Sequence, residues 1–305
     1  MSKTDDLSQS DSTRSVFLRG VLMGLAELVP GVSGGTVAFI SGIYYRLVGA
    51  LASFGPESLT MLRHPSRFWQ HHQLGFLTTL AAGMGAGILI FARLIGFMLE
   101  AAAPVLWAFF FGVIAVSVYQ IGVARRFRNL LVFGGLGLVL GFGFLSLPPQ
   151  DFSGSLTALF FAGMVAVCAW ILPGISGSFV LLLLGLYTDV IAAVNALDWR
   201  FLTVLACGCA SGLLLFTRVL GWLLHRYHDA LLALLTGFMS TALVKLWPWQ
   251  TLGASQQQRA SELFPYLRWP NEYALEGGEA FVLLAVLAGS AGGVSVWLLS
   301  RFARR

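Results

Sequence analysis

The chain has 305 residues, of which 57% are apolar and only 11% are charged, and its formal net charge is +5 at pH 7. Its mean hydropathy is +0.79, and so few charges cannot form the surface of a soluble domain of this length. The composition therefore excludes a soluble globular protein and predicts an all-α polytopic membrane protein whose solvent is the bilayer.

Residues 1–16 are polar and lack the apolar core of a signal peptide, so we expect a cytosolic N-terminal tail. The first apolar element, residues 17–51, is interrupted by the sequence Pro-Gly-Val-Ser-Gly-Gly, which begins at Pro30 and Gly31. Flanks of about 12 to 16 residues reach only ~18 to 24 Å, less than the ~30 Å hydrocarbon core. The pattern predicts a re-entrant helical hairpin whose tip lies inside the membrane.

The remainder of the first half contains one polar segment and three apolar runs. Residues 52–74 are predicted to be an interfacial segment, and its histidines are expected to lie on a solvated face, because no Cys, Asp or Glu nearby completes a metal site. The apolar runs 75–99, 105–123 and 130–147 are long enough to span a bilayer. Together these elements form a first repeat, residues 17–147.

The second half, residues 148–305, follows the same order. A second broken element, residues 157–194, contains the sequence Pro-Gly-Ile-Ser-Gly-Ser and is predicted to be another re-entrant hairpin. The predicted spans of this half are residues 201–224, 229–247 and 280–300, and the polar stretch 248–279 is predicted to form an external cap.

The two halves are related by duplication. Residues 20–50 agree with 163–193 at ten of 31 positions with an offset of 143, and residues 76–112 agree with 201–237 at fifteen of 37 with an offset of 125. Matched proline, glycine, serine and arginine residues inside apolar runs are costly choices that composition alone rarely places in register.

A hairpin returns the chain to the side from which it came, so each half has three crossings and the second repeat is inverted. With a cytosolic N-terminus, thirteen Lys and Arg residues face the cytosol and four face the other side, as the positive-inside rule requires. The prediction is two inverted repeats with both termini cytosolic. Because the basic residues sort by membrane side, they do not indicate a nucleic-acid partner.

Polar residues at the two breaks are the candidates for function. Irregular backbone inside a membrane survives only where protein or a watery cavity satisfies it, and free N–H groups with nearby hydroxyls favour an anion. Arg93 and Arg218 occupy equivalent positions, toward the outer and inner faces respectively, and would guide a phosphate. The candidate substrate-binding residues are Ser33, Gly34, Gly35, Thr36, Ser176, Gly177, Ser178, Arg93 and Arg218, and the hairpin breaks are Pro30, Gly31, Pro173 and Gly174.

Glu27 precedes the first break and has no counterpart, because Trp170 stands at the equivalent position. A carboxyl group there is costly in lipid, which makes Glu27 the candidate for coupling to a proton or cation. The alternative is a structural hydrogen bond to the hairpin backbone. Lys245 is interpreted as a residue at a span end whose amine reaches the headgroups.

Other functions remain open at this stage. The three cysteines lie in apolar stretches and form no disulfide or metal pattern, so no cofactor or metal is expected. The breaks could merely pack together as a structural crossover, or serve a carrier for a small anion or metabolite. Both breaks also fit the Gly-x-Ser-Gly of intramembrane serine proteases, which would need a general base beside the serine; all five histidines fall at span boundaries or in the interfacial segment.

The paired Pro-Gly-Val-Ser-Gly-Gly-Thr and Leu-Pro-Gly-Ile-Ser-Gly-Ser motifs, followed by Gly42-Ile-Tyr44 and Gly185-Leu-Tyr187, resemble the bacterial polyprenyl-phosphate transporter family (PopT) over residues 17 to 300. The resemblance implies a non-enzymatic translocase of the bacterial cytoplasmic (inner) membrane. Such a protein returns undecaprenyl phosphate from the outer to the inner leaflet for cell-envelope glycan synthesis. The implied partners are polyprenyl phosphate, the bilayer and a coupling ion, and the chain could form a homo-oligomer.

Overall fold

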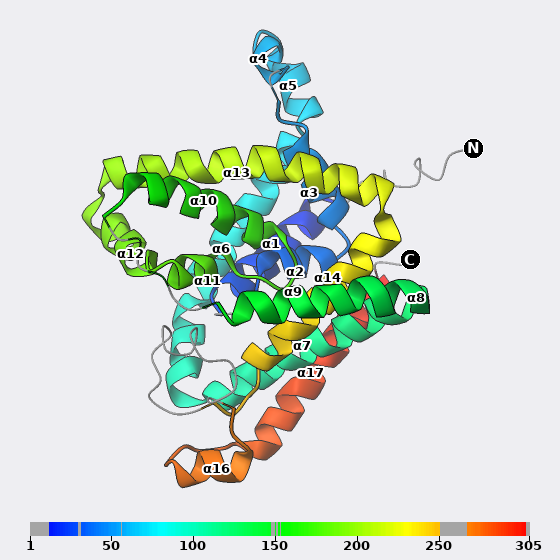
Figure 1. Cartoon of the computed structure of the whole chain (residues 1–305), viewed down its shortest axis with the longest axis vertical. Coiled ribbons are helices and arrows are strands. Elements are labelled where there is room, and N and C mark those ends of the chain that lie inside the picture. The colour runs from blue at the N-terminus through cyan, green and yellow to red at the C-terminus, as the bar shows by residue number, and fades with distance from the viewer. Residues whose placement is uncertain are drawn as a thin grey trace.

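The computed structural model describes residues 12–29, 32–55, 57–147, 150, 152, 154–250 and 267–302. Regular structure in these residues is helical, apart from an isolated bridge between Gln250 and Leu267 (Figure 1). The helices are α1 (Thr13–Glu27), α2 (Gly34–Ile40), α3 (Tyr44–Ala52), α4 (Ser58–Met61), α5 (Pro65–His71), α6 (Leu74–Ala101), α7 (Ala103–Val123), α8 (Phe127–Asn129), the π-helix η2 (Leu130–Gly134), α9 (Gly135–Leu145), α10 (Leu156–Ile171), α11 (Gly177–Leu183), α12 (Tyr187–Ala196), α13 (Trp199–Arg226), α14 (His228–Lys245), α16 (Pro270–Leu275) and α17 (Val282–Phe302).

The described part of the chain contains four helical segments that are long and apolar enough to cross a membrane. They are α6, α7, the continuous segment Phe127–Leu145 and α13. Two bent pairs accompany them, α2 with α3 at 119° and α11 with α12 at 108°. Helices α14 and α17 lie where the other two spans were predicted. The prediction of an all-α, multi-pass membrane protein is therefore confirmed.

Each broken element has two interruptions, where the sequence predicted one. Helix α2 turns back onto α1, so that a side chain on Gly34 would meet the Cβ of Met23 at 3.5 Å. A second bend, of 119°, then separates α2 from α3 at Gly42, whose φ is +81°, and Gly185 repeats it with a φ of +72°. Only glycine adopts this left-handed conformation without strain, so these matched glycines mark the second bend in both halves.

Glycines also allow the first helix of each half to run closely beside the first long span. A Cβ on Gly83 or Gly87 of α6 would strike the carbonyl oxygens of Phe17 and Val21 of α1. Gly208 and Gly212 of α13 meet α10 in the same way, at Phe160 and Met164. Residue numbers rise together along both pairs, so α1 runs parallel to α6 and α10 runs parallel to α13.

The last helices of the two halves are exchanged. Helix α7 packs against α17 of the second half, and α14 packs against η2 and α9 of the first half. Gly112 of α7 lies directly on Gly289, and its equivalent Gly237 of α14 lies directly on Gly134. Small residues let membrane helices approach closely, and here they join one half to the other.

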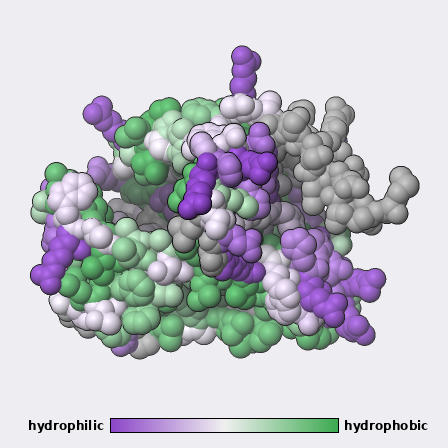
Figure 2. Space-filling view, turned by 90° about the horizontal axis from the view of Figure 1, so that it is seen from above, coloured by the Kyte–Doolittle hydropathy of each residue, from purple (hydrophilic) through white to green (hydrophobic). Residues whose placement is uncertain are grey.

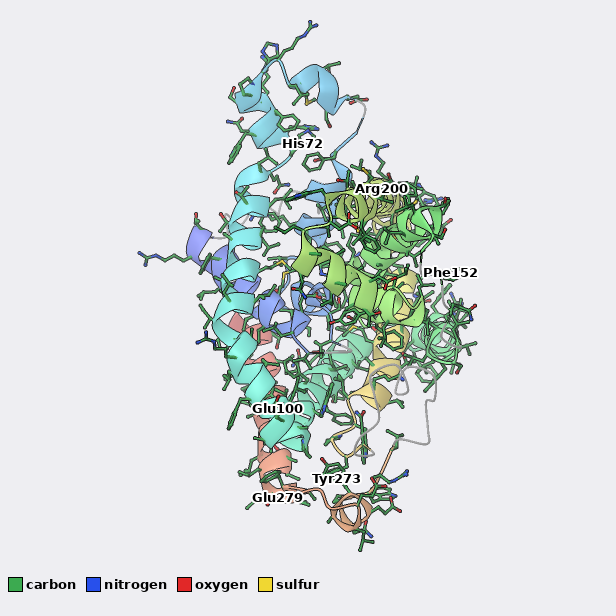
Figure 3. All side chains as sticks on the ribbon, turned by 90° about the vertical axis from the view of Figure 1, so that its left-hand side faces the viewer. His72, Glu100, Phe152, Arg200, Tyr273 and Glu279 are labelled. Atoms are coloured by element: carbon green, nitrogen blue, oxygen red, sulfur yellow. The ribbon has the colours of Figure 1, made fainter. Side chains whose placement is uncertain are left out.

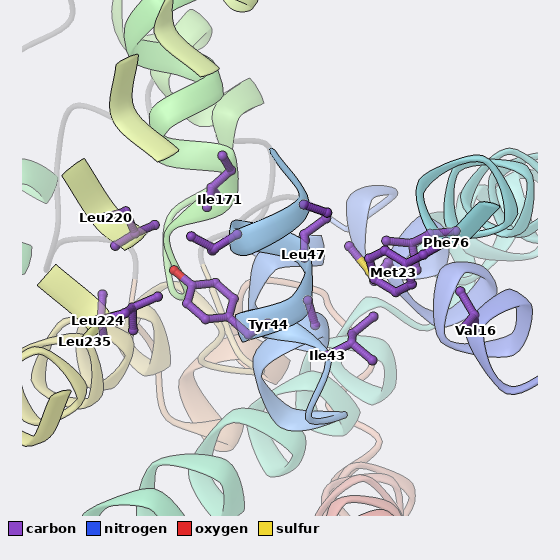
Figure 4. Packing of buried hydrophobic residues seen from close by; sticks show 14 of the residues in the cluster. Val16, Met23, Ile43, Tyr44, Leu47, Phe76, Ile171, Leu220, Leu224 and Leu235 are labelled. Atoms are coloured by element: carbon purple, nitrogen blue, oxygen red, sulfur yellow. The ribbon is translucent and has the colours of Figure 1, made fainter. Parts of the chain in front are cut away.

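The helices that leave the two broken elements differ in burial. Helix α3 packs against α13 of the other half, and Tyr44 and Leu47 enter a core with Leu220 and Leu224 (Figure 4). Helix α12 contacts α13 of its own half, and within the described residues it has no comparable packing against α6. Val48 of α3 is 1% exposed, whereas Ile191, at the equivalent position in α12, is 46% exposed.

The predicted interfacial segment contains α4 and α5, which project from one end of the molecule (Figure 1). Figure 2 looks down on this end, where hydrophilic side chains gather above a largely apolar body. His72, labelled at this end in Figure 3, is nevertheless fully buried, with Nδ1 2.7 Å from Ser53 Oγ and its ring stacked on Phe54. The expectation of a solvated histidine face is therefore wrong for His72, because aromatic rings cover it.

The opposite end carries α16, and Figure 3 labels Tyr273 and Glu279 there, beyond Glu100 at the end of α6. Residues 251–266 of the predicted external cap lie outside the described residues. Trp249 is buried in this region and donates its indole N–H to the Ala280 carbonyl at 2.8 Å. An isolated antiparallel bridge pairs Gln250 with Leu267, the residues that flank this undescribed stretch.

Candidate functional site

The two breaks lie against each other in the interior. The hydroxyl of Ser33 donates to the Trp170 carbonyl at 2.9 Å, and the N–H of Gly174 donates to Thr36 Oγ1 at 2.9 Å. Gly35 allows this contact, because a Cβ there would lie 2.6 Å from the Ile171 carbonyl oxygen. The break residues Pro30 and Gly31 lie outside the described residues.

The polar groups of the first break are already satisfied by the chain itself. Glu27 Oε1 accepts the N–H of Gly34 at 2.6 Å, and Ser33 Oγ accepts the N–H of Gly35 at 3.1 Å. Ser33 and Thr36 are completely buried. The structural hydrogen bond that was one interpretation of Glu27 therefore exists, and the Ser33 hydroxyl has both a donor and an acceptor partner.

The second break is arranged differently. Pro173 is buried and Gly174 has a φ of +93°, which turns the chain toward α11. Ser176 does not cap α11; instead its Oγ lies 2.7 Å from the Oγ of Ser178. Two hydroxyls carry two hydrogens and their mutual bond uses one, so this pair keeps a donor for another partner. Gly177 is buried at the start of α11.

A small cavity of about 20 Å³ lies beside this serine pair. It has room for about one water molecule. Its polar lining comes from Ser176, Thr241 and Lys245, and its apolar lining includes three phenylalanines. Lys245 is half-buried there, and its ammonium nitrogen lies 5.5 Å from the ring centre of Phe179. The cavity lining is Phe144, Leu145, Gly174, Ile175, Ser176, Phe179, Phe238, Thr241, Ala242 and Lys245.

The two predicted arginines lie at the periphery. Arg93 lies six residues beyond Gly87, the glycine of α6 that meets Val21 of α1. Arg93 and Arg218 are both exposed, and Arg218 donates to the Phe54 carbonyl at 2.8 Å. Among the residues with described side chains, neither guanidinium forms a hydrogen bond with Ser33 or Ser176. The structure therefore does not bring the arginines together with the break hydroxyls.

A hydrolytic use of these serines finds no general base within the described chain. The side-chain partners of Ser33 and Ser176 are backbone groups and Ser178. The histidines that form hydrogen bonds do so elsewhere, as His72 does with Ser53 and His225 does with the Gly221 carbonyl. A serine without a base in hydrogen-bond reach is a weak nucleophile.

Lys245 is the polar residue at this site that the sequence did not single out. It ends a predicted span, where a lysine normally extends toward the headgroups, and Gln120, its equivalent in the first half, is uncharged. A usable signal was present: the chain has only two lysines, and Lys245 is the one within an apolar element.

Comparison with known proteins gives a consistent result. Residues 23–264 match the family described as VCA0040-like, undecaprenyl phosphate translocase-like. A protein named polyprenyl-phosphate transporter from Vibrio cholerae is 37% identical over 258 residues, covering 83% of this chain and 84% of the relative. A second protein of that name, from Staphylococcus aureus, is 27% identical over 254 residues, covering 76% and 85%.

No solved structure matches the chain. The family match nevertheless spans most of the sequence, and it includes both Pro-Gly breaks and the long helices α6 and α13. The chain therefore belongs to the VCA0040-like, undecaprenyl phosphate translocase-like family.

Proposed function

We propose that this protein translocates polyprenyl phosphate, with undecaprenyl phosphate as the main substrate, from the outer to the inner leaflet of the bacterial cytoplasmic membrane. The observation that carries the proposal is the meeting of two polar breaks inside an apolar helical body, at Ser33 with Trp170 and Gly174 with Thr36. Polar backbone at membrane depth marks a substrate path in transporters. The curated relatives named polyprenyl-phosphate transporters support the choice of lipid.

Side chains, and not helix dipoles, would recognise the phosphate. At the start of α2 the N–H groups of Gly34 and Gly35 already donate to Glu27 and Ser33, so these N–H groups are not free to bind a phosphate. The hydroxyls of Ser176 and Ser178 are the nearest donors, and Arg93 and Arg218 would receive and release the headgroup on the two sides.

We take the two halves to be inverted repeats with both termini in the cytosol. The turn after α7 and the start of α14 are on one side, since Arg125 and Asp229 form an ion pair at 2.7 Å. Helices α6 and α13 are 28 residues each, or ~42 Å, so each is long enough to cross the ~30 Å core. In Figure 1, α13 crosses the long axis that α6 follows.

The proposed cycle is alternating access, in which α3 and α12 exchange roles. Helix α3 closes one side by packing on α13, while α12 leaves the equivalent surface of α6 open. The closed side carries a cost, because the hydroxyl of the fully buried Tyr44 has no hydrogen-bond partner among the described residues. An unsatisfied buried hydroxyl costs about 1 to 3 kcal/mol, which favours reopening. In this cycle Glu27 is the proposed site of proton or cation coupling.

The test is transport by purified protein in liposomes, measured as movement of labelled undecaprenyl phosphate between leaflets. We expect transport by the wild-type protein and its loss in Arg93→Ala and Arg218→Ala, both of which should fold normally because these side chains are exposed. Competition by undecaprenyl phosphate but not by inorganic phosphate is expected. Unchanged transport in both variants would remove the arginines from the path, and competition by inorganic phosphate alone would indicate a small-anion carrier.

A further inference from the structure

The cavity beside the second break combines two kinds of lining that a phosphorylated lipid requires. The polar part of the lining includes Lys245 and Ser176, and the Lys245 ammonium lies 5.5 Å from the ring centre of Phe179. The apolar part is aromatic: Phe144 lies 5.9 Å from Phe179 and 6.4 Å from Phe238, measured between ring centres. A small inorganic anion would have no use for this aromatic lining, whereas a phosphomonoester on an apolar chain matches both parts.

The cavity also lies next to the lipid. Its lining residues Phe144 and Leu145 belong to α9, and the outward face of the same helix exposes Val139 and Leu140, by 68% and 49%. Exposed apolar side chains on a membrane helix face acyl chains. A lipid could therefore reach the cavity sideways, past α9, without its tail leaving the bilayer.

Charge distinguishes this position from its counterpart in the first half. Near the first break the ionisable residue is Glu27, whose carboxyl oxygen already accepts from Gly34 and supplies no positive charge for a phosphate. Near the second break Trp170 replaces the carboxylate, and Lys245 replaces Gln120. The duplicated frame thus has a carboxyl group at one break and an amine at the other.

We propose that Lys245 and the hydroxyl pair of Ser176 and Ser178 bind the phosphate group of the transported lipid in this cavity. The inference rests on the proposed function and assigns its substrate site to one half of the molecule. The ammonium supplies charge, the serine pair supplies its remaining hydroxyl hydrogen, and the phenylalanines contact the first units of the polyprenyl chain. Because the cavity is only about 20 Å³, the headgroup enters as α11 and α14 move apart.

The chain offers a sharp test, because Lys3 and Lys245 are its only lysines. Full-length protein in detergent is acetylated with an amine-reactive ester, and the modification rate of each lysine is read by mass spectrometry. We expect undecaprenyl phosphate to slow the modification of Lys245 while Lys3, outside the described residues, reacts at an unchanged rate. Equal protection by undecaprenol, equal protection by inorganic phosphate, or no protection would each overturn the assignment.

A binding measurement with matched variants completes the test. Lys245→Gln should weaken undecaprenyl phosphate binding by about tenfold or more, the usual effect of losing a charged hydrogen bond. Lys245→Arg should retain most of the affinity, and Gln120→Ala at the equivalent position should retain all of it. If Lys245→Gln binds as tightly as the wild type, this inference fails alone; if the wild type itself does not bind, the proposed function fails with it. Should Lys245→Gln not fold, the labelling of the wild-type protein decides.

Discussion

Helices α3 and α12 occupy equivalent positions in a duplicated chain, yet one is buried and the other is largely exposed. Val48 of α3 packs under α13, whereas Ile191 of α12 is 46% exposed. The breaks that precede them differ as well. Glu27 accepts a hydrogen bond from Gly34 at the first break, whereas the cavity lined by Lys245 lies beside the second. Duplication thus gives two repeats with the same arrangement of helices, and a few unmatched residues make the two breaks chemically different.

The largest expected effect comes from fixing the buried helix in place. A Cβ added at Gly221 of α13 would lie 3.8 Å from the Cβ of Ala52, the usual Cβ separation in a disulfide. The pair Ala52→Cys with Gly221→Cys should therefore crosslink readily and stop transport completely. Non-reducing gel mobility and the liposome assay, before and after reduction, would measure both effects.

The equivalent positions in the other half form the matched control pair. Gly96 of α6 has no neighbour within 4 Å of an added Cβ, so Asn195→Cys with Gly96→Cys should not crosslink in the conformation described here. Crosslinking of this second pair only under transport conditions would support the proposal that α12 packs on α6 when α3 leaves α13. Both pairs require a background in which Cys168, Cys207 and Cys209 are replaced by serine. If the protein still transports when the first pair is fully crosslinked, α3 does not need to leave α13 during the cycle.

A smaller effect is expected at the first break. Glu27→Ala leaves the Gly34 N–H without its acceptor, which should lower the free energy of unfolding by about 1 to 3 kcal/mol. Glu27→Gln keeps a carbonyl acceptor and should unfold near the wild-type temperature in detergent. If Glu27 carries the coupling proton, the Gln variant folds but its transport no longer responds to a pH gradient.

The matched control for that experiment is Glu57→Gln, which changes an exposed glutamate outside the breaks. If transport by Glu27→Gln still responds to the pH gradient, Glu27 has only a structural role, as the acceptor of the Gly34 hydrogen bond. The same result would sharpen the contrast with Lys245, because the first break would then be a structural joint.

The smallest effect concerns the segment that only the first half possesses. Burial, with the neighbouring His71 as a second cause, lowers the pKa of His72. The fold therefore favours the neutral ring, so the stability contributed by His72 is present above the unfolded pKa of about 6.5 and is lost as the pH falls below it. Thermal unfolding between pH 7.5 and 5 should show a smaller loss in His72→Asn than in the wild type, with His64→Asn at the exposed position as control; equal losses in all three would contradict this.

The features that could be predicted from the sequence are those marked by residues that are costly in a membrane. Matched proline, glycine and serine indicated both breaks, and the structure adds that they meet, through the bond from Ser33 to Trp170. The matched Gly42 and Gly185 were visible too, but their role as second bends depends on positive φ angles that identity alone does not show. The exchanged packing of α17 and α9 was hidden, because apolar helices can pair in many ways without a change of composition.

The polar site was predicted less completely than the fold. Hydroxyls were assigned equally to both breaks, since sequence cannot show that Glu27 and Ser33 use the donors of the first one. Lys245 was assigned to the headgroups, because only its packing beside Ser176 separates it from an ordinary terminal lysine. His72 was placed in solvent because its covering ring, Phe54, comes from the preceding helix end.

The exchange of final helices between the halves constrains how the protein is made. The glycine face of α7 at Gly112 is covered by α17, which begins only at Val282, so a ribosome must translate almost the whole chain before that face finds its partner. The first half is therefore not an autonomous insertion unit, although it repeats the second. Splitting the gene between the halves should yield fragments that reach a stable form only when they are produced together.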